Sequence, residues 1–179
     1  AMLAERILPT TANKCPLIKK PKAAPKVLFL DIGLCAFTLN LTRDQVRDEL
    51  ISPVFNGALA EEFVGQELLA LNFHSRNTFY FWIREEKGTS SELDYLFQMG
   101  NKIIPLEVKS GSHGSLKSLH QFLHRSASNF GVKIYNGPLR FETHSVTLPG
   151  GVELKYDLLS IPFYRAFQLP ELLQKYLGT

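Results

Sequence analysis

The sequence predicts an α/β fold with a mixed central sheet flanked by helices. An amphipathic segment at residues 57–73 precedes three strand-like segments, and a second one at residues 115–125 precedes a further short strand. The third of the three strands, the second helix and the following strand form a βαβ unit. Its crossover should be right-handed, so these two strands lie parallel, whereas the three preceding strands are antiparallel. The length of 179 residues suits one domain.

The region before residue 57 is expected to contain two strands joined by a basic connector. The strands are predicted at residues 6–11 and 26–31, and the proline- and lysine-rich connector at residues 13–25 has no periodicity. Asp31 is expected to cap a short helix that ends near Leu39. Thr42 is expected to cap a second helix, at residues 43–51.

The helix at residues 57–73 is supported by an apolar stripe. Its members are Leu59, Phe63, Val64, Leu68 and Leu71. Further strands are predicted at residues 79–84, 92–99, 102–109, 132–135 and 152–156. Ser115 is expected to cap the helix at residues 115–125, and a last helix is predicted at residues 169–177. Residues 137–151 are weakly patterned.

The composition is that of an ordinary globular protein, with 45% hydrophobic and 21% charged residues. The formal net charge is only +3, so any surface for nucleic acid must be a local patch. Cys15 and Cys35 make no disulfide framework and no signal peptide is visible, which favours a reducing cytoplasm. No apolar run approaches the roughly 18 residues of a membrane helix. The opening Ala1-Met2 looks like a tag remnant, which suggests an excised fragment.

The segment that carries chemistry is the hairpin between residues 92 and 109. A two-residue Gly100-Asn101 turn pairs Met99 with Lys102. The same register places Asp94 across from Glu107, and Glu92 across from Lys109. Because side chains alternate along a strand, these four groups share one face. The other face is expected to be apolar and consists of Leu93, Tyr95, Phe97, Ile104, Leu106 and Val108.

Opposed carboxylates on neighbouring strands repel each other unless a cation lies between them. Asp94 and Glu107 supply the hard oxygen ligands that Mg²⁺ or Mn²⁺ prefers, and such ions also accept water and substrate phosphate. Lys109 can hold an attacking water or neutralise charge that develops on a phosphate. The sequence therefore indicates phosphodiester hydrolysis, against the simpler alternative of a surface strand pair with a Glu92–Lys109 salt bridge.

Four blocks in order carry a resemblance to a known family. They are Phe29-Leu-Asp31-Ile-Gly33-Leu34, the helix with Gly57-Ala-Leu-Ala-Glu61-Glu62-Phe63-Val64, Glu92-Leu-Asp94-Tyr95, and Ile104-Pro105-Leu106-Glu107-Val108-Lys109. Together they resemble the nuclease-like domain of unknown function that follows the ATPase module in many prokaryotic AAA-type ATPases. That domain is part of the PD-(D/E)XK nuclease superfamily. The resemblance runs from about residue 5 to the end.

The resemblance implies a PD-(D/E)XK, restriction-endonuclease-like core. It implies that residues 1–25 are the tail of a preceding winged helix plus the connector, and that residues 26–179 are the nuclease-like domain. Glu61, Asp94, Glu107 and Lys109 match the catalytic motif, with the first three as ligands of Mg²⁺ or Mn²⁺. A metal-dependent deoxyribonuclease that acts on DNA beside its own ATPase module is therefore expected, and no membrane partner is. The chain itself has no phosphate loop for ATP.

A second hypothesis comes from a different functional class. The domain can be a catalytically silent interaction or oligomerisation module of that ATPase. The near-neutral charge and the hydrophobic stretch at residues 158–177 favour this alternative.

Other candidate residues have competing interpretations. Glu67 competes with Glu61 as the helix carboxylate. Lys117 and Gln121 lie one helical turn apart and can reach a phosphate, but also fit a solvated helix face. His120 and His124 have a zinc-compatible spacing without an evident third ligand.

The lysine cluster and two further residues complete the set of candidates. The lysines Lys14, Lys19, Lys20, Lys22 and Lys26 can grip DNA phosphates or simply solvate the connector. Asp31 fits a helix cap better than a ligand. Trp82 fits a core position better than a base-stacking role.

Overall fold

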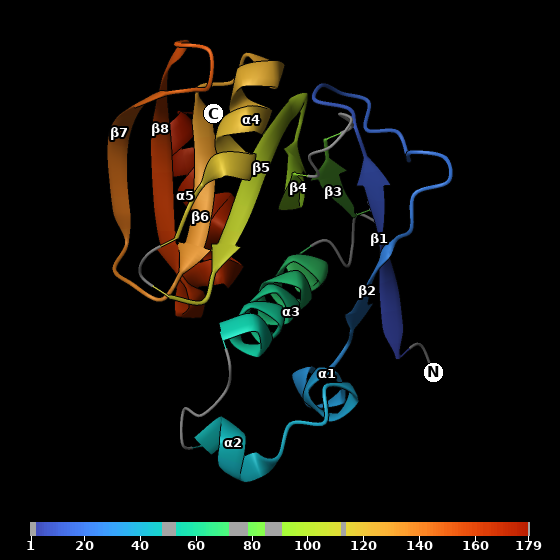
Figure 1. Cartoon of the computed structure of the whole chain (residues 1–179). Coiled ribbons are helices and arrows are strands. Elements are labelled where there is room, and N and C mark those ends of the chain that lie inside the picture. Colours follow the sequence, from blue (N-terminus) through green and yellow to red (C-terminus); the bar gives the residue numbers. More distant parts are fainter. Residues whose placement is uncertain (1–2, 48–52, 72–78, 85–90, 112–113, 179) are drawn as a thin grey trace.

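The computed structural model describes residues 3–47, 53–71, 79–84, 91–111 and 114–178, and it shows an α/β protein built on one mixed sheet (Figure 1). The strands are β1 (Ala4–Thr10), β2 (Lys26–Phe29), β3 (Tyr80–Ile83), β4 (Glu92–Met99), β5 (Lys102–Lys109), β6 (Phe130–Tyr135), β7 (Arg140–Thr147) and β8 (Glu153–Pro162). The helices are α1 (Ile32–Thr38), α2 (Arg43–Arg47), α3 (Pro53–Leu71), α4 (Lys117–Ser126), the 3₁₀ helix η1 (Phe163–Gln168) and α5 (Leu169–Leu177).

The sheet has the strand order β2-β1-β3-β4-β5-β6-β8-β7 within the described residues. The pairs β1–β3, β5–β6 and β6–β8 are parallel, and the other neighbours are antiparallel. The predicted βαβ unit is confirmed, because β5 and β6 are parallel and α4 connects them. Ala4–Thr10 lies inside this sheet, between β2 and β3.

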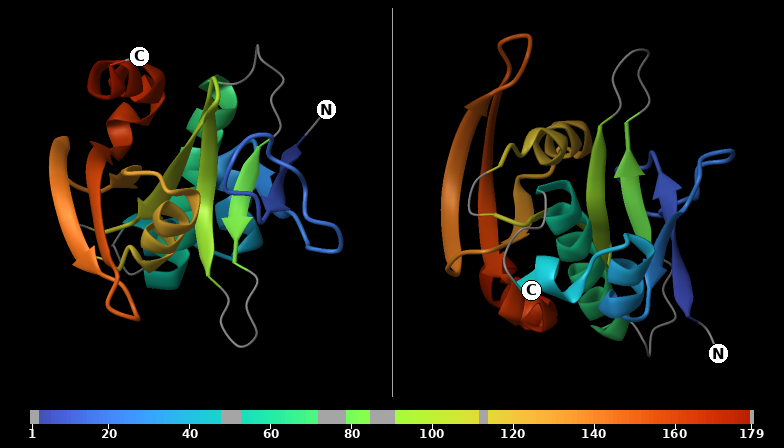
Figure 2. Two further views of the ribbon diagram at one scale, coloured as in Figure 1. Left: turned by 90° about the horizontal axis from the view of Figure 1, so that it is seen from above. Right: turned by 60° about the horizontal axis from the view of Figure 1, so that its bottom comes forward.

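Two apolar cores cover the two faces of the sheet. The first joins α3, η1 and α5 to strand residues such as Tyr95, Leu106 and Val132. The second joins α4 to Trp82, Leu96 and their neighbours. The left view of Figure 2 shows α5 and α4 on opposite sides of the strands. The prediction of helices on both faces is therefore confirmed.

Most expected elements are present, with shifted ends. The Asp31 cap is confirmed, because its Oδ1 accepts the N–H of Leu34 at 3.2 Å. Thr42 Oγ1 likewise accepts the N–H of Gln45 at 3.3 Å. Helix α3 begins four residues earlier than predicted, at Pro53. The expected ends of α2 and α3, at residues 51 and 73, lie outside the described residues, as does the opening Ala1-Met2.

One expectation about the later elements was wrong, and one strand was not predicted. Helix α4 begins at Lys117, and its N-cap residue is Leu116, without a side-chain hydrogen bond; Ser115 is therefore not the cap. Residues 137–151 contain the strand β7, which pairs along its whole length with β8. Most of its side chains are exposed, so it lacks the apolar alternation by which a strand is recognised.

No helix among the described residues is long and apolar enough to cross a membrane. Cys15 and Cys35 are both free thiols.

Candidate functional site

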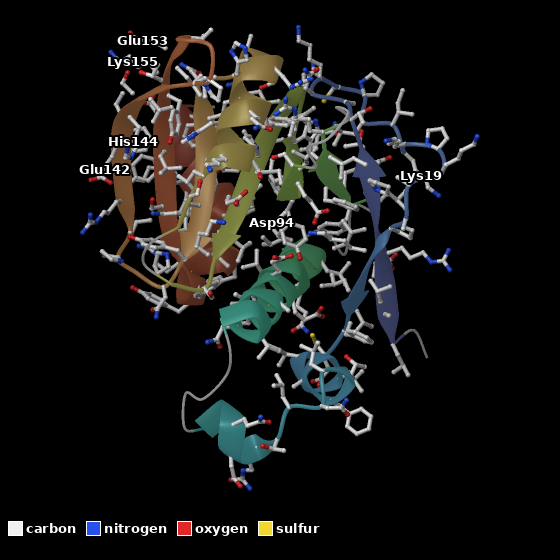
Figure 3. The ribbon with its side chains drawn as sticks, in the orientation of Figure 1. Lys19, Asp94, Glu142, His144, Glu153 and Lys155 are labelled. Carbon is white, nitrogen blue, oxygen red and sulfur yellow. The ribbon has the colours of Figure 1, made fainter. Side chains whose placement is uncertain are left out.

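The three carboxylates expected from the sequence come from one helix and two neighbouring strands. Glu61 belongs to α3, Asp94 to β4 and Glu107 to β5. Asp94 and Glu107 are only 8% and 5% exposed. Figure 3 shows Asp94 in the region between the strands and α3. Buried carboxylates need partners, so the contacts of each oxygen decide what the site can do.

The predicted hairpin register is confirmed from the turn to the edge of the site. Met99 pairs with Lys102, and the same register continues to Tyr95 opposite Leu106. Asp94 lies one step beyond this ladder. Its Oδ2 accepts the backbone N–H of Val108 at 2.7 Å. The Asp94 carboxylate is thus fixed directly to the strand that carries Glu107.

A bulge in β4 explains why the ladder stops there. The pairing of β3 with β4 shifts by one residue, because Tyr80 pairs with Leu96 whereas Trp82 pairs with Leu93. As a result Leu93 packs in the core under α4, while Tyr95 packs in the core under α3. The expectation that both lie on one face was wrong, since an extra residue inverts the alternation.

Glu107 and Lys109 interact along the same strand. Lys109 Nζ lies 2.7 Å from Glu107 Oε1. Glu107 Oε2 is buried and has no hydrogen-bond partner among the described residues. The expected pairing of Lys109 with Glu92 was wrong, because β4 leaves the hairpin register at the bulge and Glu92 pairs with Lys26 instead.

Lys26, the first residue of β2, is the cation that sequence reasoning did not place in the site. Its Nζ lies 2.5 Å from Glu92 Oε1, 3.3 Å from Glu61 Oε2 and 4.0 Å from Asp94 Oδ1. The only sequence signal was a lysine at the start of a strand, which is not diagnostic. The cluster therefore consists of Lys26, Glu61, Glu92, Asp94, Glu107 and Lys109, called below the charged cluster.

The two buried acids titrate abnormally. Burial, followed by repulsion from Glu61 and Glu107, holds the pKa of Asp94 well above its usual range. Burial also raises the pKa of Glu107, against the opposing effect of Lys109. Burial alone lowers the pKa of Lys26, but Glu61, Asp94 and Glu92 together outweigh it and raise that pKa. Both acids therefore hold a proton more readily than an exposed carboxyl group does.

Helix α3 is held close to the site by Tyr95. The Tyr95 hydroxyl donates to the backbone carbonyl of Glu61 at 2.8 Å. Gly65 permits this approach, because a Cβ there would meet Leu28 Cδ1 at 2.5 Å and Tyr95 Oη at 2.6 Å. Glu61, and not its competitor Glu67, is the α3 carboxylate in the ion pair with Lys26.

The carboxylate oxygens of Asp94 and Glu107 are the type of ligand that a small divalent cation prefers. Among the described residues, no three His, Cys, Asp or Glu side chains are arranged to hold a metal ion. Mg²⁺, however, is often held by one or two carboxylates, with water and phosphate as its other ligands. The unpartnered Glu107 Oε2 is the acceptor that such an ion would satisfy.

The other sequence candidates lie on α4. Lys117 is exposed at its first turn. Gln121 lines a hollow of about 150 Å³ together with Arg84, His124 and Arg125. His120 Nε2 is 2.7 Å from the Tyr156 hydroxyl, and His124 is exposed, so these two histidines do not come together as the zinc-compatible spacing would allow.

The remaining candidates lie in the core or away from the charged cluster. Trp82 is buried and packs edge-on against Phe122, which confirms the core interpretation. Figure 3 shows Lys19 on the connector, far from Asp94, and Glu142, His144, Glu153 and Lys155 on the β7–β8 edge.

The fold and the charged cluster define an α/β protein with a mixed sheet and buried acidic groups on the central strands. Residues 56–150 match the family described as a domain of unknown function (DUF4143), and this match covers more than half of the chain. The chain belongs to that family. The matched span includes every member of the charged cluster except Lys26. No curated protein and no solved structure matches the chain.

Proposed function

We propose that the charged cluster is a divalent-metal site for phosphodiester hydrolysis, in a fold of the PD-(D/E)XK type. The observation that carries this proposal is the pair of buried acids Asp94 and Glu107, with a free Glu107 oxygen and Lys109 beside them. Two repelling acids in a desolvated position are costly for an apo protein, and a cation removes that cost. A merely structural ion pair would have no need of the second acid.

Each residue has a role that its contacts support. Asp94 and Glu107 would hold Mg²⁺ or Mn²⁺, which when bound supplies a Lewis acid and a more acidic water. The Val108 N–H orients Asp94. Lys109 has three N–H donors and gives one to Glu107, so the others can orient water or stabilise charge on a phosphate. Glu61 shapes the site through Lys26.

DNA is the substrate that the resemblance to AAA-associated nuclease-like domains favours, and the ATPase module of a longer protein is the expected partner. The basic hollow beside Gln121 on α4 supports a phosphate contact outside the charged cluster. Phosphate contacts give most non-specific affinity for DNA, and they weaken with salt. The modest charge of this chain is consistent with a need for a second module to grip the substrate.

The experiment has a binding arm and a cleavage arm. Calorimetric titration with Mn²⁺ should show binding to the wild type and none to Asp94→Asn, while Glu153→Gln, on the far edge of the sheet, should behave as the wild type. The full-length protein, with and without ATP, is then given linear, nicked and branched DNA. Absence of Mn²⁺ binding by the wild type, or of both DNA binding and cleavage by the metal-loaded protein, refutes the proposal.

A second candidate function, partner binding, is favoured by an exposed apolar surface around α1 and η1. Phe37, Tyr164 and Phe167 are largely exposed. A hollow of about 250 Å³ is lined by Ile32 of α1, by Leu59, Ala60 and Phe63 of α3, and by Phe163 of η1. Exposed apolar patches of this kind mark interaction sites. Sedimentation of the wild type and of Phe37→Ser tests it, since a shared monomeric mass would argue against self-association through this surface.

A further inference from the structure

Lys26 is surrounded by carboxylates in the way a bound cation is. Its three acidic neighbours, Glu61, Glu92 and Asp94, come from α3 and β4, while Lys26 itself comes from β2. The side chain is only 25% exposed. Its Nζ also lies 5.1 Å from the centre of the Phe81 ring. An ordinary surface lysine keeps its ammonium in water, whereas this one directs it into the protein.

The formal charges of the cluster can be balanced by one further divalent cation. Four carboxylates face two ammonium groups, so two negative charges remain when all are ionised. Lys26 is near Glu61, Glu92 and Asp94, and Lys109 is bound to Glu107. Asp94 links the two halves geometrically, because it lies 4.0 Å from Lys26 and also accepts the backbone N–H of Val108, the residue next to Glu107. A single divalent ion beside Asp94 and Glu107 would therefore complete the neutralisation.

The ligands around Lys26 are those that a hard divalent cation prefers. Phosphodiesterases with two metal ions place them roughly 3.5–4 Å apart, with shared carboxylates between them. An ammonium and a hydrated Mg²⁺ both bind carboxylate oxygens, but the ammonium is covalently tethered and cannot dissociate. A cation is thus already seated at the position next to the proposed metal.

We propose that the ammonium of Lys26 takes the place of a second metal ion and so limits this chain to one divalent cation. The part about the first ion rests on the proposed function, but the occupation of the second position by Lys26 does not. With Lys26 between them, Glu61, Glu92 and Asp94 are not arranged to hold a metal ion, and we expect them to close around one when the amine is removed. Lys26 is a positioning residue in this scheme, because it acts through the acids that it holds.

The test measures the number of Mn²⁺ ions bound per chain. Equilibrium dialysis separates bound from free Mn²⁺, and electron paramagnetic resonance measures the free ion. The wild type should bind one Mn²⁺. Lys26→Met, which keeps the length of the apolar stem, should bind two. Adding Glu92→Gln to Lys26→Met should remove the extra ion. Lys102→Met, at the exposed turn of the hairpin, is the matched control and should bind as the wild type does.

The outcomes separate this inference from the proposed function. If the wild type binds no Mn²⁺ and Lys26→Met binds one, the proposed site at Asp94 and Glu107 fails while the inference about Lys26 stands. If both proteins bind one Mn²⁺, the inference is overturned and the proposed metal site stands. Two ions on the wild type also overturn it. Lys26→Gln, whose amide can still donate to the carboxylates, replaces Lys26→Met if the latter does not fold, with the same readout.

Discussion

The raised pKa of Asp94 predicts an unusual dependence of stability on pH, which Asp94→Asn should remove. The native state binds a proton at Asp94 more tightly than the unfolded state does, so stability falls as pH rises from the unfolded-state pKa toward the folded one. Within that window each pH unit costs about 1.4 kcal/mol for one group. For a domain of this size that is a melting temperature lower by roughly 3–5 °C per unit. Asparagine can still accept the Val108 N–H without the charge.

The assay is thermal unfolding followed by circular dichroism in EDTA, from pH 5 to pH 8, for the wild type and Asp94→Asn. The lowered pKa of His120, caused by burial and by His144, acts in the opposite direction, but it is common to both proteins and cancels in their difference. The wild type should lose stability relative to the variant as pH rises, and Mg²⁺ should reverse this loss at pH 8 in the wild type alone. If the melting temperatures of the two proteins change with pH in parallel, the reasoning is refuted.

Three further predictions concern individual contacts. Lys109→Met should keep Mn²⁺ binding and lose DNA cleavage by at least about tenfold, because the lysine acts on the reacting phosphate and not on the ion; loss of Mn²⁺ binding in calorimetry would contradict this assignment. Tyr95→Phe should cost about 1–2 kcal/mol in urea denaturation, because it removes the hydrogen bond to the Glu61 carbonyl; an unchanged midpoint would show that this bond does not hold α3. Gly65→Ala should destabilise by about 1–3 kcal/mol, because the new Cβ would clash with Leu28 and Tyr95, whereas Gly57→Ala, with open space around it, should not.

The parts of the fold that local rules control were predictable from the sequence. The β4–β5 register follows from the two-residue turn, and Gly100 has the positive φ of 59° that this turn requires. The Asp31 cap and the burial of Trp82 likewise depend on nearby residues or on apolar character. In each case the sequence pattern and the structural feature that it predicts lie within one helix, one strand or one hairpin.

The parts that were missed depend on contacts between segments far apart in the chain. The bulge in β4 arises where it pairs with β3, and nothing within residues 92–99 alone signals it. Lys26 lies on β2, which β1 and β3 separate from β4, and its ammonium extends over Phe81 of β3 to Asp94; no single sequence pattern encodes that arrangement. The edge strand β7 was missed because it buries too little to be periodic.

The bulge connects the fold to the proposed chemistry. Had β4 kept strict alternation, Leu93 would share the α3 face with Tyr95, and Asp94 would remain a ladder residue opposite Glu107. The extra residue instead lets Leu93 pack under α4, and it releases the Asp94 carboxylate to take the Val108 N–H and approach Lys26. Local irregularities that orient a side chain are typical of functional sites, since a sheet gains no stability from a broken ladder. The irregularity spans Asp94 and Tyr95, between Leu93 and Leu96, and the acid with the strongly raised pKa, Asp94, therefore lies within it.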